Sequence, residues 1–130
     1  MRVLIADDSA VMRKVLQRAL AEPWTNITDI AEAANGREAL EYLRHCREVG
    51  EELDLILCDI NMPVMDGLTF LESAQAEGLV ADTPTVIVTT ESGERMVLRA
   101  IAAGARGYIC KPFTAEQVRD RITPLLHRAA

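Results

Sequence analysis

Short apolar runs alternate along the chain with longer segments in which apolar residues recur every three or four positions. The short runs are typical of strands that are buried on both faces, and the longer segments are typical of amphipathic helices. We expect strands at residues 3–6, 27–33, 53–58, 84–90 and 107–110, and helices at 9–21, 36–49, 67–77, 93–104 and 114–128. This alternation predicts parallel βαβ units, and hence a doubly wound α/β fold with five helices on the two faces of a five-stranded parallel sheet.

Local signals mark several helix ends. Ser9 can cap the first helix, Thr114 and Gln117 have the spacing of a capping box, and Gly104 is expected to end the fourth helix. Pro124 lies inside the last helical segment, where we expect it to kink or shorten the helix.

Composition narrows the class of protein. The 130 residues, 49% of them hydrophobic, suit a single domain spanning residues 1–130, with its own core and no output domain. A net charge of -6 with scattered basic residues argues against binding to nucleic acid or to an anionic membrane. No apolar run approaches the roughly 20 residues of a membrane span, and an odd number of cysteines, three, suits a reducing compartment. We therefore expect a cytoplasmic protein.

Polar residues follow the strands at the edge where the carboxyl ends of parallel strands meet, which is where open α/β sheets bind ligands. They are Asp7 and Asp8 after the first strand, Glu32 and Asn35 after the second, Asp59 after the third, Thr89 and Thr90 after the fourth, and Lys111 after the fifth. Three carboxylates brought together repel one another, so a stable fold needs cations among them. Lys111 supplies one charge, and oxygen ligands without His or Cys favour Mg²⁺, or Mn²⁺, as the other cation.

Each of these residues also has an ordinary structural explanation. An aspartate pair after a strand often caps a helix, Lys111 could lie in a plain turn, and Thr89 could simply be a strand residue. Chance explains poorly why all of them fall at one edge while the strands behind them are nearly free of charge.

Four motifs together resemble the receiver domain of response regulators, over essentially the whole chain. They are "ADDS" at 6–9, "CDINMPVMDG" at 58–67, "VIVTTES" at 86–92 and "GYICKPF" at 107–113. Each motif is modest evidence alone, but the four in this order and spacing are specific. The likeness is to stand-alone, CheY-like receivers, and it implies a flavodoxin-like fold with strand order 2-1-3-4-5. It also implies a cis peptide bond between Lys111 and Pro112.

The resemblance implies a role in a two-component system. Asp59 would accept a phosphoryl group from the phosphohistidine of a histidine kinase or a histidine phosphotransfer protein. Lys111 would pair with Asp59 and then with a phosphoryl oxygen, and Thr89 would donate its hydroxyl to another. Such a domain is not an enzyme with a separate substrate, but it catalyses its own phosphorylation and dephosphorylation.

The same resemblance implies a set of metal ligands. Asp8, Asp59 and the backbone carbonyl of Asn61 would bind Mg²⁺ directly, and Asp7 would bind it through a water molecule.

A switch and an output surface are also implied. Phosphorylation would draw Thr89 inward, and Tyr108 would rotate into the space that Thr89 leaves. This would change the face formed by the fourth helix, the fifth strand and the fifth helix, with Val97, Tyr108 and Arg121 among its exposed residues. A downstream target protein would bind that face.

The lifetime of the phosphorylated state is expected to depend on residues beside the acceptor. In the receiver family, the positions occupied here by Asn61 and Glu91 tune hydrolysis. Thr90 is expected to lengthen the lifetime, because a β-branched side chain there would crowd the path of the attacking water.

Three other functions fit the sequence less well than a receiver. An aspartate-nucleophile phosphatase of the haloacid-dehalogenase type needs a second aspartate two positions after the first, where this chain has Asn61. A flavodoxin-like FMN carrier needs a phosphate loop where Asp7 and Asp8 would repel the phosphate. An unphosphorylated docking module leaves the complete charge set unexplained. The sequence leaves open whether the receiver is a motor effector, a phosphate sink or a relay intermediate, and whether it was excised from a longer regulator.

Overall fold

The computed structural model describes residues 1–21 and 26–126, so the end of the last expected helix, residues 127–128, lies outside the described residues. The strands are β1 (Arg2–Ala6), β2 (Asp29–Ala33), β3 (Leu55–Cys58), β4 (Thr85–Thr89) and β5 (Gly107–Cys110). The helices are α1 (Ala10–Leu20), α2 (Gly36–Val49), α3 (Gly67–Ala76), α4 (Glu94–Ala102) and α5 (Ala115–Leu126).

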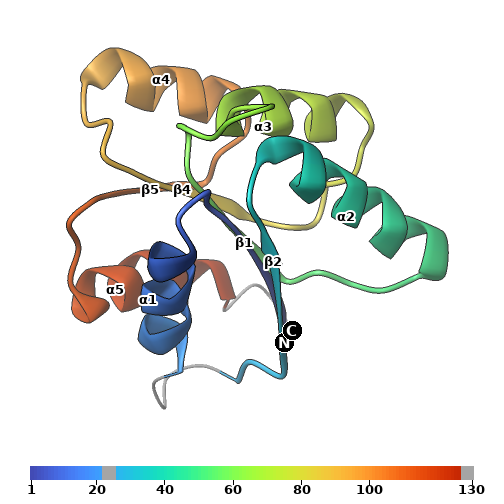
Figure 1. Cartoon of the computed structure of the whole chain (residues 1–130), viewed down its shortest axis with the longest axis horizontal. Coiled ribbons are helices and arrows are strands. Elements are labelled where there is room, and N and C mark those ends of the chain that lie inside the picture. The colour runs from blue at the N-terminus through green and yellow to red at the C-terminus, as the bar shows by residue number, and fades with distance from the viewer. Residues whose placement is uncertain (22–25, 127–130) are drawn as a thin grey trace.

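The strands form one sheet in the order β2-β1-β3-β4-β5, and every neighbouring pair is parallel. Helices α2, α3 and α4 lie on one side of the sheet, and α1 and α5 lie on the other (Figure 1). This confirms the doubly wound α/β fold and the strand order that the family resemblance implied. The carboxyl ends of β1, β3, β4 and β5 therefore meet at one edge of the sheet.

The central strands are buried on both faces. Leu4, Ile56 and Ile87 point into the apolar cluster beneath α2, α3 and α4. Their neighbours in the strands contribute to the second cluster beneath α1 and α5, which contains Val3, Leu57 and Val86. Every residue of β3 is buried, so the strand that precedes Asp59 is packed from both sides and holds its end in a fixed position.

The expected helix ends are largely confirmed. The Ser9 hydroxyl accepts a hydrogen bond from the Met12 amide at 3.1 Å, and Gly104, with φ of 109°, follows the cap of α4. Thr114 and Gln117 form a reciprocal capping box, in which each backbone amide donates to the other side chain, at 2.9 and 3.1 Å.

Pro124 does not shorten α5, because the helix continues through it to Leu126. The carbonyl that lacks a donor because of the proline belongs to Asp120, which is exposed, so water can satisfy it.

Cys46 and Cys58 are buried and Cys110 is exposed, and all three are free thiols. Among residues 1–21 and 26–126, no helix combines the length and the apolar character needed to cross a membrane.

Candidate functional site

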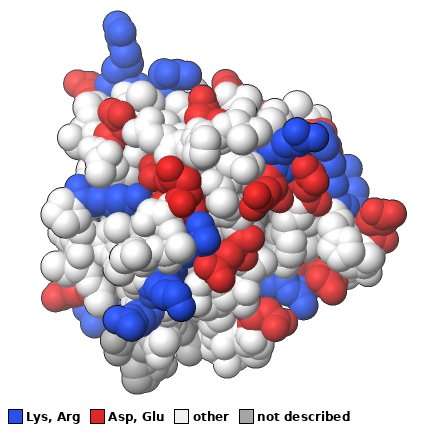
Figure 2. Space-filling view, in the orientation of Figure 1, with Lys and Arg blue, Asp and Glu red and all other residues white. Residues whose placement is uncertain are grey.

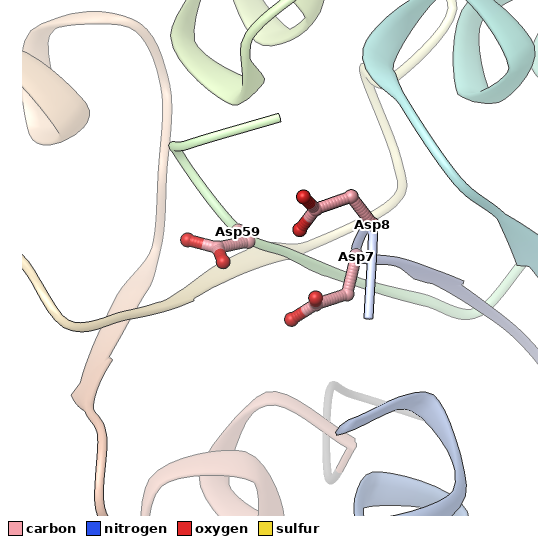
Figure 3. A group of neighbouring side chains, drawn as sticks. All are labelled: Asp7, Asp8 and Asp59. Atoms are coloured by element: carbon pink, nitrogen blue, oxygen red, sulfur yellow. The ribbon is translucent and has the colours of Figure 1, made fainter. Parts of the chain in front are cut away.

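Three carboxylates lie together at the carboxyl edge of the sheet. The register pairs Ala6 of β1 with Cys58 of β3, so the residues that follow these two also lie side by side. One oxygen from each of Asp7, Asp8 and Asp59 lies within 4.8 Å of the others. Figure 3 shows the three side chains next to one another. Asp7 and Asp59 are 1% and 7% exposed, whereas Asp8 is open to solvent. The expected grouping of these aspartates is confirmed.

Lys111 lies between the two buried carboxylates. Its Nζ donates to Asp7 Oδ2 at 2.7 Å and to Asp59 Oδ2 at 2.9 Å, and its side chain is only 12% exposed. Burial alone would lower the pKa of Lys111, but the hydrogen bonds that it donates to the two carboxylates, together with their negative charges, outweigh burial and raise the pKa. The ammonium group is therefore charged at neutral pH. The bond to Asp7 was not expected from the sequence, and the peptide bond between Lys111 and Pro112 is cis, as expected.

The charges at this edge do not cancel. The ammonium of Lys111 pairs with Asp7 and Asp59, and the carboxylate of Asp8 lies beside them, which leaves an excess of negative charge. Acidic side chains gather in the middle of the face that Figure 2 shows, and basic side chains lie mostly around them. An oxygen-only donor set with excess negative charge fits a hard divalent cation.

The loop after Asp59 is tightly packed. The Asp59 amide donates to the Ala6 carbonyl at 3.0 Å, and the Gly67 amide donates to the Ile60 carbonyl at 2.8 Å. A Cβ atom at position 67 would overlap the Asp59 carbonyl oxygen, so only glycine fits there. Asp66 caps α3 by accepting from the Thr69 amide at 2.7 Å. The Asp-Gly pair thus starts α3 close behind Asp59.

Glu91, in the loop between β4 and α4, joins three residues that the sequence had indicated separately. Its amide donates to the Thr89 hydroxyl at 3.4 Å, and its carbonyl accepts from the Tyr108 hydroxyl at 2.6 Å. Its carboxylate accepts from the Asn61 amide group at 3.1 Å. Thr89 is fully buried. Burial, followed by the nearby Cys110 and Glu91, raises the pKa of Tyr108.

Two of the three residues that we expected to be exposed on the face formed by α4, β5 and α5 are only partly exposed. Val97 and Tyr108 are half-buried, and only Arg121 is exposed as expected. Tyr108 is partly covered because its hydroxyl turns toward Glu91. The face nevertheless carries exposed apolar side chains, Leu98 and Ile101 of α4. It also contains a cavity of about 330 Å³, lined in part by Tyr108, Gln117 and Arg121.

Sequence reasoning missed one residue at the acidic edge, Arg13 of α1. Its guanidinium donates to the Asp7 carbonyl oxygen at 2.6 Å and to the Glu32 carboxylate at 2.9 Å. The only signal in the sequence was its place in the first turns of the helix that follows the aspartate pair.

Comparison with known proteins agrees with this geometry. The family model described as response regulator receiver domain matches residues 3–123. A chemotaxis protein CheY homolog of Campylobacter jejuni is 34% identical, over 97% of this chain and 92% of its own length. The chemotaxis protein CheY of Pseudomonas aeruginosa is 32% identical, over 98% of this chain and 98% of its own length. A chain in the solved CheX-CheY-BeF3-Mg²⁺ complex of Borrelia burgdorferi has a TM-score of 0.85 and 27% identity, and the match covers 98% of this chain and 90% of that one.

Proposed function

The chain belongs to the response regulator receiver domain family, and from this we propose that it is a phosphorylation-activated switch whose phosphoacceptor is Asp59. The observation that carries the proposal is the Asp59 carboxylate, which lies at the end of a fully buried strand beside Lys111 and two further aspartates.

In the proposed reaction, a carboxylate oxygen of Asp59 attacks the phosphorus of a phosphohistidine on a histidine kinase or a phosphotransfer protein. A P–O bond forms and the P–N bond breaks. Its electron pair stays with the imidazole, which takes up a proton, and Asp59 becomes an acyl phosphate. Phosphoryl transfer of this kind depends mainly on alignment and on neutralising the charge of the phosphoryl oxygens.

We propose Asp8, Asp59 and the Asn61 carbonyl as direct ligands of Mg²⁺, with Mn²⁺ as a substitute, and Asp7 as a ligand through water. Both carboxylate oxygens of Asp7 are already engaged, one by the Ser9 amide at 2.9 Å and one by Lys111. Asp59 differs, because its Oδ1 accepts only a longer hydrogen bond, 3.3 Å, from the Asn61 amide. Among the described residues nothing bonds to the exposed Asp8 carboxylate. These contacts support an indirect role for Asp7 and direct roles for Asp8 and Asp59. The Borrelia complex contains Mg²⁺, which also favours this cation. When bound, the ion would offset negative charge on the phosphoryl group.

Lys111 and Thr89 would then contact the phosphoryl oxygens, so that the chain catalyses its own phosphorylation and dephosphorylation. The Lys111 ammonium is held beside Asp59 before phosphorylation, at 2.9 Å, and needs only to move from one oxygen to another.

The output would run from Thr89 through Glu91 to Tyr108. Movement of the Thr89 hydroxyl toward the phosphoryl group would disturb its bond with the Glu91 amide, and the Glu91 carbonyl holds the Tyr108 hydroxyl. A change at Tyr108 alters the face formed by α4, β5 and α5, where we place the binding site for a downstream protein.

Asp59→Asn tests the acceptor. This variant should fold normally but take no label from acetyl phosphate in the presence of Mg²⁺, because its amide cannot form an acyl phosphate. Incorporation of radiolabelled phosphate, measured with circular dichroism of the same sample, checks this. Asp66→Asn is the matched control, because it makes the same change at an exposed helix cap where asparagine serves equally well.

Acid-labile label on Asp59→Asn at the wild-type level would contradict the assignment. Loss of label from Asp66→Asn as well as Asp59→Asn would show that the effect is not specific to the acceptor.

A further inference from the structure

Arg13 spans the gap between the end of β2 and the turn that follows β1. Its Nε donates to Glu32 Oε1 at 2.9 Å, and its terminal nitrogen donates to the backbone carbonyl of Asp7 at 2.6 Å. The side chain is only 17% exposed, so its charge is largely withdrawn from water. Withdrawing a guanidinium group from water costs free energy, and its hydrogen bonds to Glu32 and Asp7 offset that cost.

With Arg13 in place, every polar atom of Asp7 has a partner. The amide donates to the Ala33 carbonyl at 3.0 Å, and the carboxylate is bound by the Ser9 amide and by Lys111. Arg13 supplies the fourth contact, at the carbonyl oxygen. Asp8 differs, because no hydrogen bond or ion pair holds its carboxylate within the part of the chain that the structure describes.

We propose that Arg13 is a positioning residue for the metal site, acting on Asp8 through the peptide bond that joins Asp7 to Asp8. The carbonyl that Arg13 binds belongs to that peptide bond. Because a peptide unit is planar, fixing its carbonyl oxygen also fixes where the Asp8 side chain starts. The exposed Asp8 carboxylate is thereby kept beside Asp59, although none of the described residues bonds to it directly. This inference rests on the proposed Mg²⁺ site.

The charge of Arg13 and its positioning of Asp8 should have opposite effects on Mg²⁺ affinity, so an experiment can distinguish them. The guanidinium is a cation close to a cation site, so if its charge were all that mattered, its removal would strengthen Mg²⁺ binding. A positioning role predicts weaker binding, because Asp8 would no longer be held for the ion. Partners that orient metal ligands commonly contribute about tenfold or more to metal affinity.

Three variants separate these effects. Arg13→Met removes both contacts and the charge, and should weaken Mg²⁺ binding about tenfold. Lys14→Met is the matched control, because it removes the same charge from the neighbouring exposed residue without touching Asp7, and should bind Mg²⁺ as wild type does or slightly more tightly. Arg13→Lys keeps the charge but has a single donor nitrogen, which cannot bond both oxygens with the same geometry. Its affinity should fall between those of Arg13→Met and Lys14→Met, about threefold weaker than wild type.

Isothermal titration of the EDTA-treated proteins with MgCl₂ measures the affinities, and urea unfolding without metal shows whether each variant folds. The inference is overturned if Arg13→Met binds Mg²⁺ as tightly as wild type or more tightly, or if Lys14→Met loses as much affinity as Arg13→Met. Should Arg13→Met fail to fold, Arg13→Lys decides alone, and affinity equal to wild type overturns the inference.

The same samples separate this inference from the proposed function. If wild type binds Mg²⁺ and Arg13→Met does not, but acetyl phosphate labels neither protein, the positioning role stands and the phosphoacceptor proposal fails. If wild type takes label and Arg13→Met keeps full Mg²⁺ affinity, only the positioning role fails. If wild type binds no Mg²⁺, both fail.

Discussion

Lys111 holds two buried carboxylates at once, so the stability of the site depends on its ammonium group. The side chains of Asp7 and Asp59 are only 2% and 9% exposed, so water replaces the lysine poorly as their partner. An unpaired charge in such a place costs several kcal/mol. Because the pKa of Lys111 is raised above its ordinary value of 10.5, its contribution to stability is complete below pH 10.5 and is lost only as the pH rises through the raised pKa.

Lys111→Met should therefore lower the free energy of unfolding by about 3 kcal/mol in buffer with EDTA at pH 7. Urea denaturation followed by circular dichroism measures this. Lys14→Met, which removes a lysine that is exposed on α1, should change stability by less than about 0.5 kcal/mol. Equal stability of the two variants would show that the bonds from Lys111 to Asp7 and Asp59 contribute nothing net to folding.

At the level of elements, the loop between β4 and α4 connects the acidic edge with the face formed by α4, β5 and α5. Glu91 bonds to Asn61 on one side and to Tyr108 on the other, and its amide reaches Thr89 at the end of β4. Thr90 lies between these contacts and is exposed. A short loop held by this many hydrogen bonds has little freedom to move independently. A small displacement of Thr89 can therefore also shift Tyr108.

Thr90→Ala tests whether this loop also sets the lifetime of the phosphorylated state. Removal of a β-branched side chain should open the in-line path for water and for small donors. A steric cost of about 1 kcal/mol corresponds to a change of roughly fivefold in both rates. Phosphate release and stopped-flow phosphorylation by acetyl phosphate measure them. Thr69→Ala, at an exposed threonine of α3, is the control. An alanine variant equal to or slower than wild type in both reactions would leave the lifetime to Asn61 and Glu91.

The bounds of an element were predictable where its buried apolar residues extend as far as its backbone hydrogen bonds. The expected ranges 36–49 and 107–110 agree with α2 and β5 at both ends. The expected strand 27–33 begins later, at Asp29, because Ile27 packs against the core without belonging to the strand. Apolar patterning reports burial and cannot separate these two cases. The strand order came from the family resemblance.

The candidate site was predictable only as a grouping of strand ends. Parallel strands bring their carboxyl ends to one edge, so the meeting of Asp7, Asp8 and Asp59 follows from topology. The contacts of Arg13 and Glu91 do not follow from it, because they depend on side-chain rotamers and on how closely loops approach one another. No spacing in the sequence encodes those distances.

For the whole molecule, folding brings together carboxylates that are far apart in the chain. Asp7 and Asp8 lie at one end of the sequence and Asp59 near its middle, yet their oxygens approach within 4.8 Å in the fold. A chain with a net charge of -6 gathers part of that charge at one edge, where the carboxylates repel one another. The unfolded chain has no comparable cluster, so a cation that binds the cluster should favour the folded state.

Mg²⁺ should therefore stabilise the wild-type protein against urea. At a free Mg²⁺ concentration ten times the dissociation constant, linkage predicts a gain of about 1.4 kcal/mol in the free energy of unfolding. Asp8→Ala should lose nearly all of this gain, because Asp8 is the one carboxylate of the three that does not pair with Lys111. Asp120→Ala, which removes the same charge from an exposed position on α5, should keep it. Unfolding in NaCl of equal ionic strength separates specific binding from screening, because salt screens all exposed charges alike. If Mg²⁺ stabilises Asp8→Ala as much as wild type, or NaCl reproduces the whole gain, the ion does not bind at the carboxyl ends of β1 and β3.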